Sequence, residues 1–556
     1  KWRSMPRFIQ LYICLLLIAI TLLFAFALFA PSNQMSAVDN NEKIKLLEET
    51  VIKAALNRQH TSTKSTSFKS VKKDLNDKRI SWEADLKDPI IPPNDKQLKI
   101  IEAMRHSWSG YLSHAWGYDN LKPITKEGSN WFGVGLTIID SLDTLLLMGL
   151  EKEYNEALEW VKNDLTFDVN RYVNCFEMTI RVLGGLLSAY HLTDDPILAG
   201  KAEDIGERLI HCFDSPSKVI PYSDVHLKTK RAKGPLWSPD STVAEISSMQ
   251  IEFRDLSRVL KRKKYEYVSF KTSQTLHNLS VKNGDPLVPM YINPISVRFT
   301  PSTITLGARS DSYYEYLLKQ YLQTGIRWLQ DDYLKAVEAI NDRLVRTTQG
   351  PLKLTFIGEN LRNSEFYPKM DHLTCFFAGT LALGYYHNTL NERKDLSDVF
   401  EQHLEFAKSL ARTCYYMYNL TATGLSPEIA HFHLAPTLNS KDELIIRSAD
   451  THNLLRPEYV ESLFYLYHIT KDENYRDEGW EIFEAFNRHC RVETGGYTSI
   501  DNVLDVNETR PKNFQESFWT AETLKYLFLL FSDDKVLIHK LLNNYIFNTE
   551  AHLIPL

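Results

Sequence analysis

Apolar residues recur at helical spacing through most of the chain. In residues 456–470, four apolar side chains follow the i, i+3, i+4, i+7 pattern that places one stripe on a helix: Val460, Leu463, Phe464 and Tyr467. Many other segments share this pattern. The sequence therefore predicts a mainly helical protein.

Short charged segments separate the apolar stretches and are typical of turns between helices. Seven of them occur at irregular intervals, at 148–154, 192–196, 260–267, 329–333, 390–396, 470–475 and 531–537. A helix–turn–helix unit repeated seven times predicts an all-α fold, either closed as an (α/α)7 barrel or open as a helical array. Segments that alternate as strands do are scarce, and the main candidates are 287–299 and 544–556.

Acidic residues recur where the helix before each charged segment begins. Glu458 and Glu461 lie in the first turns of the helix at 456–470, next to Arg456. Other helices begin with Asp140 and Asp143, Glu177 and Arg181, Glu245, Arg309 with Asp311 and Glu315, Asp371 with His372, and Glu516 with Glu522. Such acids can simply complement helix dipoles. If the helices run parallel around a barrel, the same acids surround one pocket.

A pocket of this kind suits a neutral, polyhydroxylated ligand. Carboxylates accept hydrogen bonds from sugar hydroxyls, guanidinium groups donate them, and rings such as Phe518 can stack on pyranose faces. Paired carboxylates in different environments also supply the acid and the base of glycoside hydrolysis. The sequence contains no G-x-S-x-G, Walker A or H-E-x-x-H motif. The chemistry therefore favours a glycosidase.

The N-terminal region predicts a membrane anchor. Residues 11–30 are uncharged and apolar, and are long enough to cross the roughly 30 Å hydrocarbon core of a bilayer. Basic residues precede this segment, which predicts a type II topology with residues 1–10 in the cytosol, a polar lumenal stem at 31–95 and a catalytic domain at 96–556. A cleaved signal peptide is the alternative. Either way, the bulk of the chain is expected outside the cytosol.

Charge and cysteine usage narrow the remaining possibilities. A formal charge of -6, without a basic stripe, gives no reason to expect nucleic acid as a partner, and the sequence predicts no particular oligomeric state.

Disulfides persist in an oxidising compartment. An odd number of cysteines lies outside residues 11–30, so at least one thiol should stay free: Cys175, Cys212, Cys375, Cys414 and Cys490.

Nine ordered motifs resemble the class I α-1,2-mannosidases, glycoside hydrolase family 47. From about residue 97 onward the chain reads HAWGYD, LTIIDSLDTLLLMGL, FEMTIRVLGGLLSAY, LGARSDSYYEYLLKQ, MDHLTCFFAGTLALG, TGLSPEIA, LLRPEYVESLFYLY, ESFWTAETLKYLFLLFSDD and FNTEAH. Within the family, the chain is most similar to the members of the endoplasmic reticulum. The resemblance implies an (α/α)7 barrel with a C-terminal β-type plug, an inverting mechanism and one Ca²⁺.

The resemblance also implies roles for individual residues. The implied catalytic carboxylates are Glu177, Asp311, Glu428 and Glu458. Thr549 of FNTEAH would bind Ca²⁺, a hard ion, through its hydroxyl and carbonyl oxygens. The implied substrate-binding residues are Arg181, Glu245, Arg309, His372, Arg456, Glu461, Phe518, Glu522 and Glu550. The family disulfide corresponds to Cys375 and Cys414, which leaves Cys175, Cys212 and Cys490 reduced.

Inversion requires an acid for the leaving oxygen and a base for the attacking water, about 6.5 to 9.5 Å apart. Glu458, in a first helical turn beside Arg456, is expected to be ionised and is our predicted base. Glu177 is the predicted acid, acting directly or through a water. Asp311 is the rival acid, and Glu428 could assist either step.

The implied activity removes one mannose from the middle branch of the nine-mannose N-glycan on glycoproteins, at the endoplasmic reticulum membrane. Arg309 bears on this expectation, because in the family an arginine here goes with the removal of one mannose and a smaller apolar residue with further trimming. An ordinary ion pair with Asp311 is the structural alternative for Arg309. For the whole protein, the alternatives are a Golgi-type enzyme that trims to five mannoses and a mannosidase-like glycan receptor in glycoprotein degradation.

Overall fold

The computed structural model describes residues 91–556 apart from 236–237 and 391–393, and there the chain alternates between two sets of helices. The inner set consists of α5 (Leu136–Leu147), α7, η2 and α8 (Cys175–Glu177, Met178–Leu183 and Gly184–Thr193), α10 and α11 (Val243–Ser247 and Gln250–Leu260), α13 (Asp311–Thr324), α15 (Phe376–Leu390), α17 (Glu458–Thr470), and η7 with α19 (Trp519–Thr523 and Leu524–Leu530). The outer set consists of α4 (Asp95–His114), α6 (Glu151–Asn163), α9 (Pro196–Leu209), α12 (Lys264–Asn283), α14 (Arg327–Arg343), α16 (Ser397–Asn419) and α18 (Asn474–His489).

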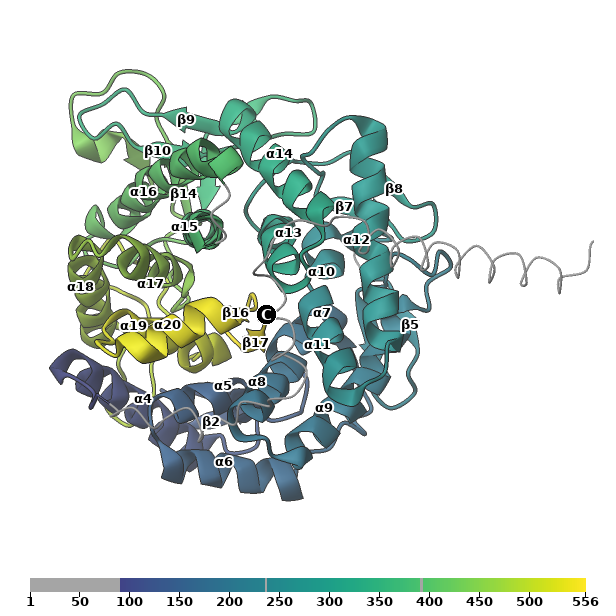
Figure 1. Ribbon diagram of the computed structural model, residues 1–556. Coiled ribbons are helices and arrows are strands. Elements are labelled where there is room, and N and C mark those ends of the chain that lie inside the picture. Colours follow the sequence, from purple (N-terminus) through teal and green to yellow (C-terminus); the bar gives the residue numbers. More distant parts are fainter. Residues whose placement is uncertain (1–90, 236–237, 391–393) are drawn as a thin grey trace, which may run out of the picture. The chain divides into compact units, whose positions relative to one another are not determined.

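The inner helices form a closed ring. Each packs against the next one along the chain, and η7 with α19 packs against α5. Figure 1 shows this ring, with the outer helices around it. The prediction of an all-α barrel of seven helix pairs is therefore confirmed for the described residues, and the alternative of an open array is wrong.

Burial separates the two sets in the way that the sequence pattern requires. The outer helix α6 buries one stripe, formed by Tyr154, Ala157, Leu158 and Val161. All seven residues of the inner helix α19 are buried. An inner helix has neighbours on most sides, so it buries residues almost all round.

The C-terminal hairpin lies at the centre of the ring (Figure 1). Helix α20 (Lys535–Asn544) leads into β16 (Tyr545–Phe547), which pairs with β17 (Leu553–Pro555) in antiparallel register. Strand β17 packs against α8 and α11. Leu553 and Ile554 are fully buried. The predicted β-type plug is present.

Six of the seven charged segments lie between consecutive helices, as predicted. Five of these separate an inner helix from the outer helix that follows it, and 531–537 separates α19 from α20. The seventh prediction, 329–333, is wrong, because this segment lies inside α14. The turn comes earlier, where Gly325 adopts a φ of 69° and ends α13. Asp332 instead accepts a hydrogen bond of 2.7 Å from His277 on α12. These charges therefore mark a contact between helices.

Short strands at the ends of the helices form several small sheets. The two predicted strand regions contain β7 (Tyr291–Asn293) with β8 (Arg298–Thr300), and β16 with β17. The sequence did not indicate the others: β1 (Asn120–Lys122), β2 (Glu127–Ser129), β3 (Tyr172–Asn174), β4 (Asp224–His226), β5 (Ala232–Lys233), β6 (Ser241–Thr242), β9 (Val345–Thr347), β10 (Thr355–Ile357), β11 (Glu359–Asn360), β12 (Phe366–Tyr367), β13 (Lys369–Asp371), β14 (Ile429–Phe432) and β15 (Leu444–Ile445).

Three of these sheets lead directly into inner helices. In the sheet β3–β4–β5 the strand β3 leads into α7, in β6–β7–β8 the strand β6 leads into α10, and in β13–β14–β15 the strand β13 leads into α15 through η4 (His372–Cys375). In each case the strand ends where the helix begins. The sheets therefore fix the positions of Glu177, Glu245 and His372 at the helix starts.

The structure contains two disulfides in its described part. Cys375 pairs with Cys414 as the resemblance implied. The expectation that Cys175 and Cys212 stay reduced is wrong, because they form a second disulfide. Pairing of β3 with β4 brings the start of α7 close to η3 (Ile210–Phe213), a proximity that the sequence did not reveal. Cys490 is a buried free thiol.

The predicted tail at 1–10, the membrane segment at 11–30 and residues 31–90 of the predicted stem lie outside the described residues. Within the described part, no helix is both long enough and apolar enough to cross a bilayer.

Candidate active site

One cavity of about 320 Å³ collects most of the predicted site residues. Its lining includes Glu177, Arg181, Glu245, Arg309, Asp311, Arg456, Glu458, Glu461, Phe518, Glu522, Thr549 and Glu550. These side chains come from the starts of five inner helices and from the turn after β16. His372 and Glu428 touch the same site through Glu458 and Arg456. The structure thus brings together residues that are up to 373 positions apart (550 minus 177).

Glu458 is held by two basic side chains. His372 Nδ1 donates a hydrogen bond of 2.8 Å to Glu458 Oε2, and Arg456 Nη1 lies 3.6 Å from Oε1. His372 is fixed in turn by Tyr418, whose oxygen lies 2.8 Å from Nε2. Burial alone would raise the pKa of Glu458, but the hydrogen bond from His372 and the charge of Arg456 hold it below its ordinary value. Glu458 is therefore ionised near neutral pH.

Asp311 has the opposite protonation behaviour. It is the first residue of α13, and Ser312 N donates a hydrogen bond of 2.9 Å to its Oδ1. Burial, together with the negative charges of Glu315, Asp371 and Glu458, outweighs this bond and raises the pKa of Asp311 to about 7. Asp311 can therefore hold a proton in the same cavity in which Glu458 is ionised.

Two arginines organise the remaining carboxylates. Arg456 Nε donates a hydrogen bond of 2.6 Å to Glu428 Oε2. Arg181 Nε donates one of 2.8 Å to Glu177 Oε2, and Arg181 also pairs with Glu550. The two guanidinium carbons lie 5.6 and 5.8 Å from the Phe518 ring centroid. Both guanidinium groups therefore lie within the range of a cation–π interaction with this ring.

Deeper carboxylates in the cavity have raised pKa values. Burial, with the charges of Glu315 and Glu458, raises the pKa of Glu461 to about 8, although Lys319 Nζ lies 3.9 Å away. Burial likewise raises the pKa of Glu245 to about 7. Protonated carboxyl groups can donate hydrogen bonds as well as accept them, which suits recognition of hydroxyl groups.

Sequence reasoning missed Lys319 as part of the site. This lysine is 1% exposed and forms an ion pair with Glu315, one turn earlier on α13. The sequence could have indicated its role, because a lysine on the apolar face of an inner helix needs a buried acid as its partner. Its charge lowers the pKa of Glu461 and so limits how far burial raises it.

Two π-helical segments carry site residues. Arg181 lies within η2 and Glu522 within η7. Such segments are rare and occur often at functional sites, because the extra residue changes the direction of a side chain. The apolar pattern of these helices gave no sign of them.

The turn at 548–552 forms the floor of the cavity. Asn548 Oδ1 accepts hydrogen bonds from the backbone N–H groups of Glu550 and His552, at 3.0 and 2.8 Å. Thr549 N donates to Tyr316 Oη at 3.3 Å. Among the described residues, no hydrogen bond occupies the hydroxyl or carbonyl oxygen of Thr549. Two such oxygens beside several carboxyl groups fit Ca²⁺, which prefers oxygen ligands.

A buried network, which we call the hairpin anchor, holds this turn in place: His552, Lys525, Asp140 and Asp143. The His552 ring nitrogens lie 3.0 Å from Asp140 Oδ1 and 3.0 Å from Asp143 Oδ2. Lys525 Nζ lies 2.9 Å from Asp143 and donates a hydrogen bond of 2.6 Å to the Ala551 carbonyl. Burial alone would lower the pKa of His552, but the two aspartates raise it to about 9.

Arg309 lies at the wall of the cavity with an unusual backbone. Its φ is 80°, a conformation that non-glycine residues rarely adopt. Just before it, Ala308 N donates a hydrogen bond of 3.2 Å to Asp371 Oδ2, and Gly307 lies so close to Asp371 that a Cβ atom would clash. Backbone strain of this kind persists where surrounding contacts enforce it.

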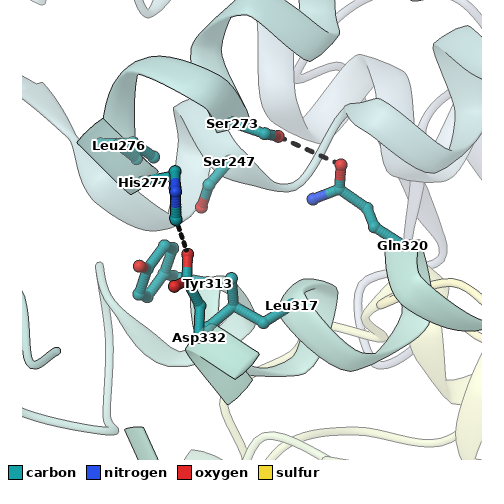
Figure 2. Close-up of a pocket in the computed structure, with 8 residues that line it drawn as sticks. All are labelled: Ser247, Ser273, Leu276, His277, Tyr313, Leu317, Gln320 and Asp332. Carbon is teal, nitrogen blue, oxygen red and sulfur yellow. Dashed lines mark hydrogen bonds and ion pairs between the residues drawn. The ribbon is translucent and has the colours of Figure 1, made fainter. Parts of the chain in front are cut away.

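A second, much smaller cavity lies between α10, α12, α13 and α14. Figure 2 shows its lining, with the bonds between Ser273 and Gln320 and between His277 and Asp332. Its free volume of about 10 Å³ is room for about one water. None of the predicted site residues lines it. The cavity therefore cannot take a sugar and is not the candidate site.

Residues 103–556 match the family described as Glycosyl hydrolase family 47. The chain belongs to this family. The prediction of membership, and with it the prediction that the chain is a glycoside hydrolase, is confirmed. The family match begins in α4 and includes every residue that lines the large cavity.

The family's curated members include close relatives. The chain is 52% identical over 468 residues to the endoplasmic reticulum mannosyl-oligosaccharide 1,2-alpha-mannosidase of Rattus norvegicus, covering 84% of this chain and 69% of the relative. It is 51% identical over 466 residues to the Homo sapiens protein of the same name, covering 83% and 64%. The solved α-1,2-mannosidase from Trichoderma reesei has a TM-score of 0.74 at 27% identity, and the match covers 84% of this chain and 100% of that one.

Proposed function

We propose that this chain is a calcium-dependent, inverting exo-α-1,2-mannosidase that trims the nine-mannose N-glycan of glycoproteins to the eight-mannose form. The names of the family-47 relatives support the bond and the substrate class. The observation that carries the proposal is that Glu458 and Asp311 share one cavity although their pKa values are shifted in opposite directions. One carboxylate and one carboxylic acid are what an inverting glycosidase requires.

Glu458 acts as the base in this proposal. Its Oε atoms, held by His372 and Arg456, accept a proton from the water that attacks the anomeric carbon. Asp311 is the group that carries a proton near neutral pH, so we assign it as the acid that protonates the leaving oxygen. Glu177, paired with Arg181, then contacts the substrate or a bridging water rather than donating the proton.

Thr549, with waters held by the carboxyl groups around it, would hold Ca²⁺ at the floor of the cavity. Within the described residues, no cluster of three or more His, Cys, Asp or Glu side chains could bind a metal ion. Bound there, Ca²⁺ would bind hydroxyls of the terminal mannose and help to distort its ring. Arg181, Glu461, Phe518, Glu522 and Glu550 would contact the same sugar.

The relatives' names also support residence in the endoplasmic reticulum. We propose a type II membrane protein with its catalytic domain in the lumen, anchored by residues 11–30. Arg309 at the cavity wall would contact one branch of the glycan and so restrict trimming to a single mannose.

The decisive experiment incubates the lumenal fragment with the nine-mannose glycan and Ca²⁺ and follows the products by chromatography. The proposal expects one free mannose and an eight-mannose product. Trimming to five mannoses at ordinary enzyme levels would indicate a Golgi-type enzyme. Binding without any release between pH 5 and 8 would indicate a glycan receptor.

The assignment of the acid has its own test. An α-mannosyl fluoride loses its leaving group without protonation, so a variant that lacks only the acid should hydrolyse it far better than it hydrolyses the glycan. We expect this behaviour from Asp311→Asn. If Glu177→Gln shows it instead, Glu177 is the acid.

A further inference from the structure

The two disulfides occupy equivalent places in two of the helix pairs. Cys175 is the first residue of α7, and Cys212 lies in η3 directly after the outer helix α9. Cys375 directly precedes α15, and Cys414 lies toward the end of the outer helix α16. The pairs are separated by 37 and 39 residues. Each disulfide therefore joins the start of an inner helix to the end of the outer helix that follows it.

Both inner helices begin irregularly. Helix α7 has only three residues before the π segment η2, and α15 begins after the 3-10 segment η4. A 3-10 segment has poorer backbone hydrogen-bond geometry than a regular α-helix, and a π segment interrupts the regular α-helical hydrogen bonds. A helix start of this kind is held less firmly by its own backbone, so a covalent bond to a neighbouring element has a larger effect on its position.

Each disulfide is close in sequence to a residue of the active site. Glu177 follows Cys175 by two positions, and His372 precedes Cys375 by three. Neither cysteine pair is exposed, since all four residues are at most 1% exposed. The disulfides therefore lie within the barrel wall and do not contact the cavity themselves.

The contacts around Cys175 lead to the carboxylates. Asn174 Oδ1 accepts a hydrogen bond of 3.0 Å from Glu177 N, and Asn174 Nδ2 donates one of 3.2 Å to Glu245 Oε1. Cys175 N itself donates to the Ser223 carbonyl at 2.8 Å. A shift of Cys175 would therefore move both Glu177 and the residue that contacts Glu245.

We propose that Cys175 and Cys212 form a positioning disulfide that aligns Glu177 and Arg181 in the cavity. The inference rests on the proposed mannosidase function and goes beyond it. Arg181 lies four residues after Glu177 and bonds to it, so the two side chains move with the start of α7. Without the disulfide the barrel still closes, but these side chains lose their alignment with the reacting sugar.

The first test is peptide mapping of the oxidised protein after blocking free thiols without reduction. We expect the peptides that contain Cys175 and Cys212 to be linked, and Cys490 to be modified only after unfolding. Blocked thiols at both Cys175 and Cys212 in the native, active enzyme would overturn the inference.

The second test compares the double variant Cys175→Ser/Cys212→Ser with Cys490→Ser, a matched control at another buried cysteine. Turnover of the nine-mannose glycan is measured well below the melting temperature of each protein. We expect kcat of the double variant to fall by about tenfold or more, because small misplacements of aligned groups reduce rates steeply, whereas the control should keep the kcat of the wild type. Lower melting temperature with unchanged kcat would show a merely structural role and overturn the inference.

A third measurement separates failure of the inference from failure of the proposed function. A mannose-configured iminosugar mimics the charged transition state, so its affinity should fall with kcat. Calorimetry measures the affinity of the double variant and of the control for this iminosugar. The measurement reports on the alignment of Glu177 and Arg181 even if the glycan is not the substrate. Equal affinity in the double variant and the control would overturn the inference, whereas absence of glycan turnover in the wild type would overturn only the proposed function.

If the double variant does not fold, graded reduction of the wild type replaces it. Alkylation and peptide mapping then show which disulfide has opened in each sample. Loss of turnover that follows the alkylation of Cys175 supports the inference. Full turnover in molecules with alkylated Cys175 contradicts it.

Discussion

Glu458 and Asp311 show how one cavity holds two carboxyl groups in different protonation states. Glu458 is buried but faces His372 and Arg456, whereas Asp311 is buried among other acids. Burial penalises the charged form of both, and only Glu458 has cations that compensate for it. The partners, rather than the depth of burial, decide which group can act as the base.

Replacing Glu458 by glutamine should abolish turnover and leave glycan binding intact. The substitution preserves the shape and one hydrogen bond to His372 but removes the basic oxygen, so kcat should fall by about 100-fold or more. Single-turnover kinetics and calorimetry check the two parts. Turnover within tenfold of wild type would exclude Glu458 as the base.

The pH dependence of kcat/KM should be bell-shaped. Activity needs Glu458 ionised and Asp311 protonated, so it should rise as pH passes the lowered pKa of Glu458 and fall as pH passes about 7, the pKa of Asp311. Initial rates between pH 4 and 9 provide the profile. In the variant Asp311→Asn the residual activity should lose the alkaline limb, and an unchanged limb would assign it to another group.

At the scale of elements, the hairpin anchor determines how firmly the floor of the cavity is held. His552 lies between Asp140 and Asp143, and Lys525 holds the Ala551 carbonyl next to it. All four anchor side chains are fully buried. The turn that carries Thr549 is therefore attached to α5 and α19 by charged contacts as well as by apolar packing.

The anchor makes stability depend on pH in the alkaline range. The pKa of His552 is raised to about 9 in the folded state and is near 6.5 in an unfolded chain. Its contribution is therefore complete below about pH 6.5 and is lost as pH rises through 9. Melting temperatures at fixed Ca²⁺ should fall across this range in wild type and fall less in His552→Gln, which should already be less stable at pH 6.5. Parallel curves for the two proteins would contradict this assignment.

How far the sequence predicts the elements depends on whether a feature is local. Apolar periodicity predicted the helices, because the spacing of apolar residues along a helix depends only on residues that are close together in the sequence. The second disulfide and the sheets around Asn174 and Asp371 were missed, because they depend on segments about 40 to 60 residues apart meeting in space. The turn predicted at 329–333 was wrong for a related reason, because Asp332 there pairs with His277, which belongs to another helix.

At the scale of the whole molecule, closure of the ring creates the site. Glu177 and Glu458 belong to inner helices on different parts of the ring. Both line the same cavity as Glu550 of the turn at 548–552, and Glu550 pairs with Arg181. The motifs of the family predicted which residues meet there, whereas periodicity alone left the acids as possible dipole partners. Only the closed ring distinguishes acids that surround one pocket from acids that complement separate helix dipoles, because parallel inner helices place their starts together.

Removal of Ca²⁺ should abolish hydrolysis and lower the melting temperature. An ion that binds only the folded chain stabilises it by mass action, by about 2.7 kcal/mol when its concentration is 100 times Kd. Differential scanning fluorimetry with and without a chelator measures this shift, and Thr549→Val serves as the matched variant. If the chelator lowers the melting temperature of wild type and variant equally, Thr549 is not the ligand.

The hairpin at the centre of the ring follows all seven inner helices in chain order. During synthesis, a nascent chain that has already produced Glu177, Asp311 and Glu458 still lacks the turn at 548–552 and the strand that fills the axis. Assembly of the site must therefore wait until translation has passed residue 555. A ribosome-bound precursor carries every proposed proton-transfer group and yet has no completed pocket in which to use them.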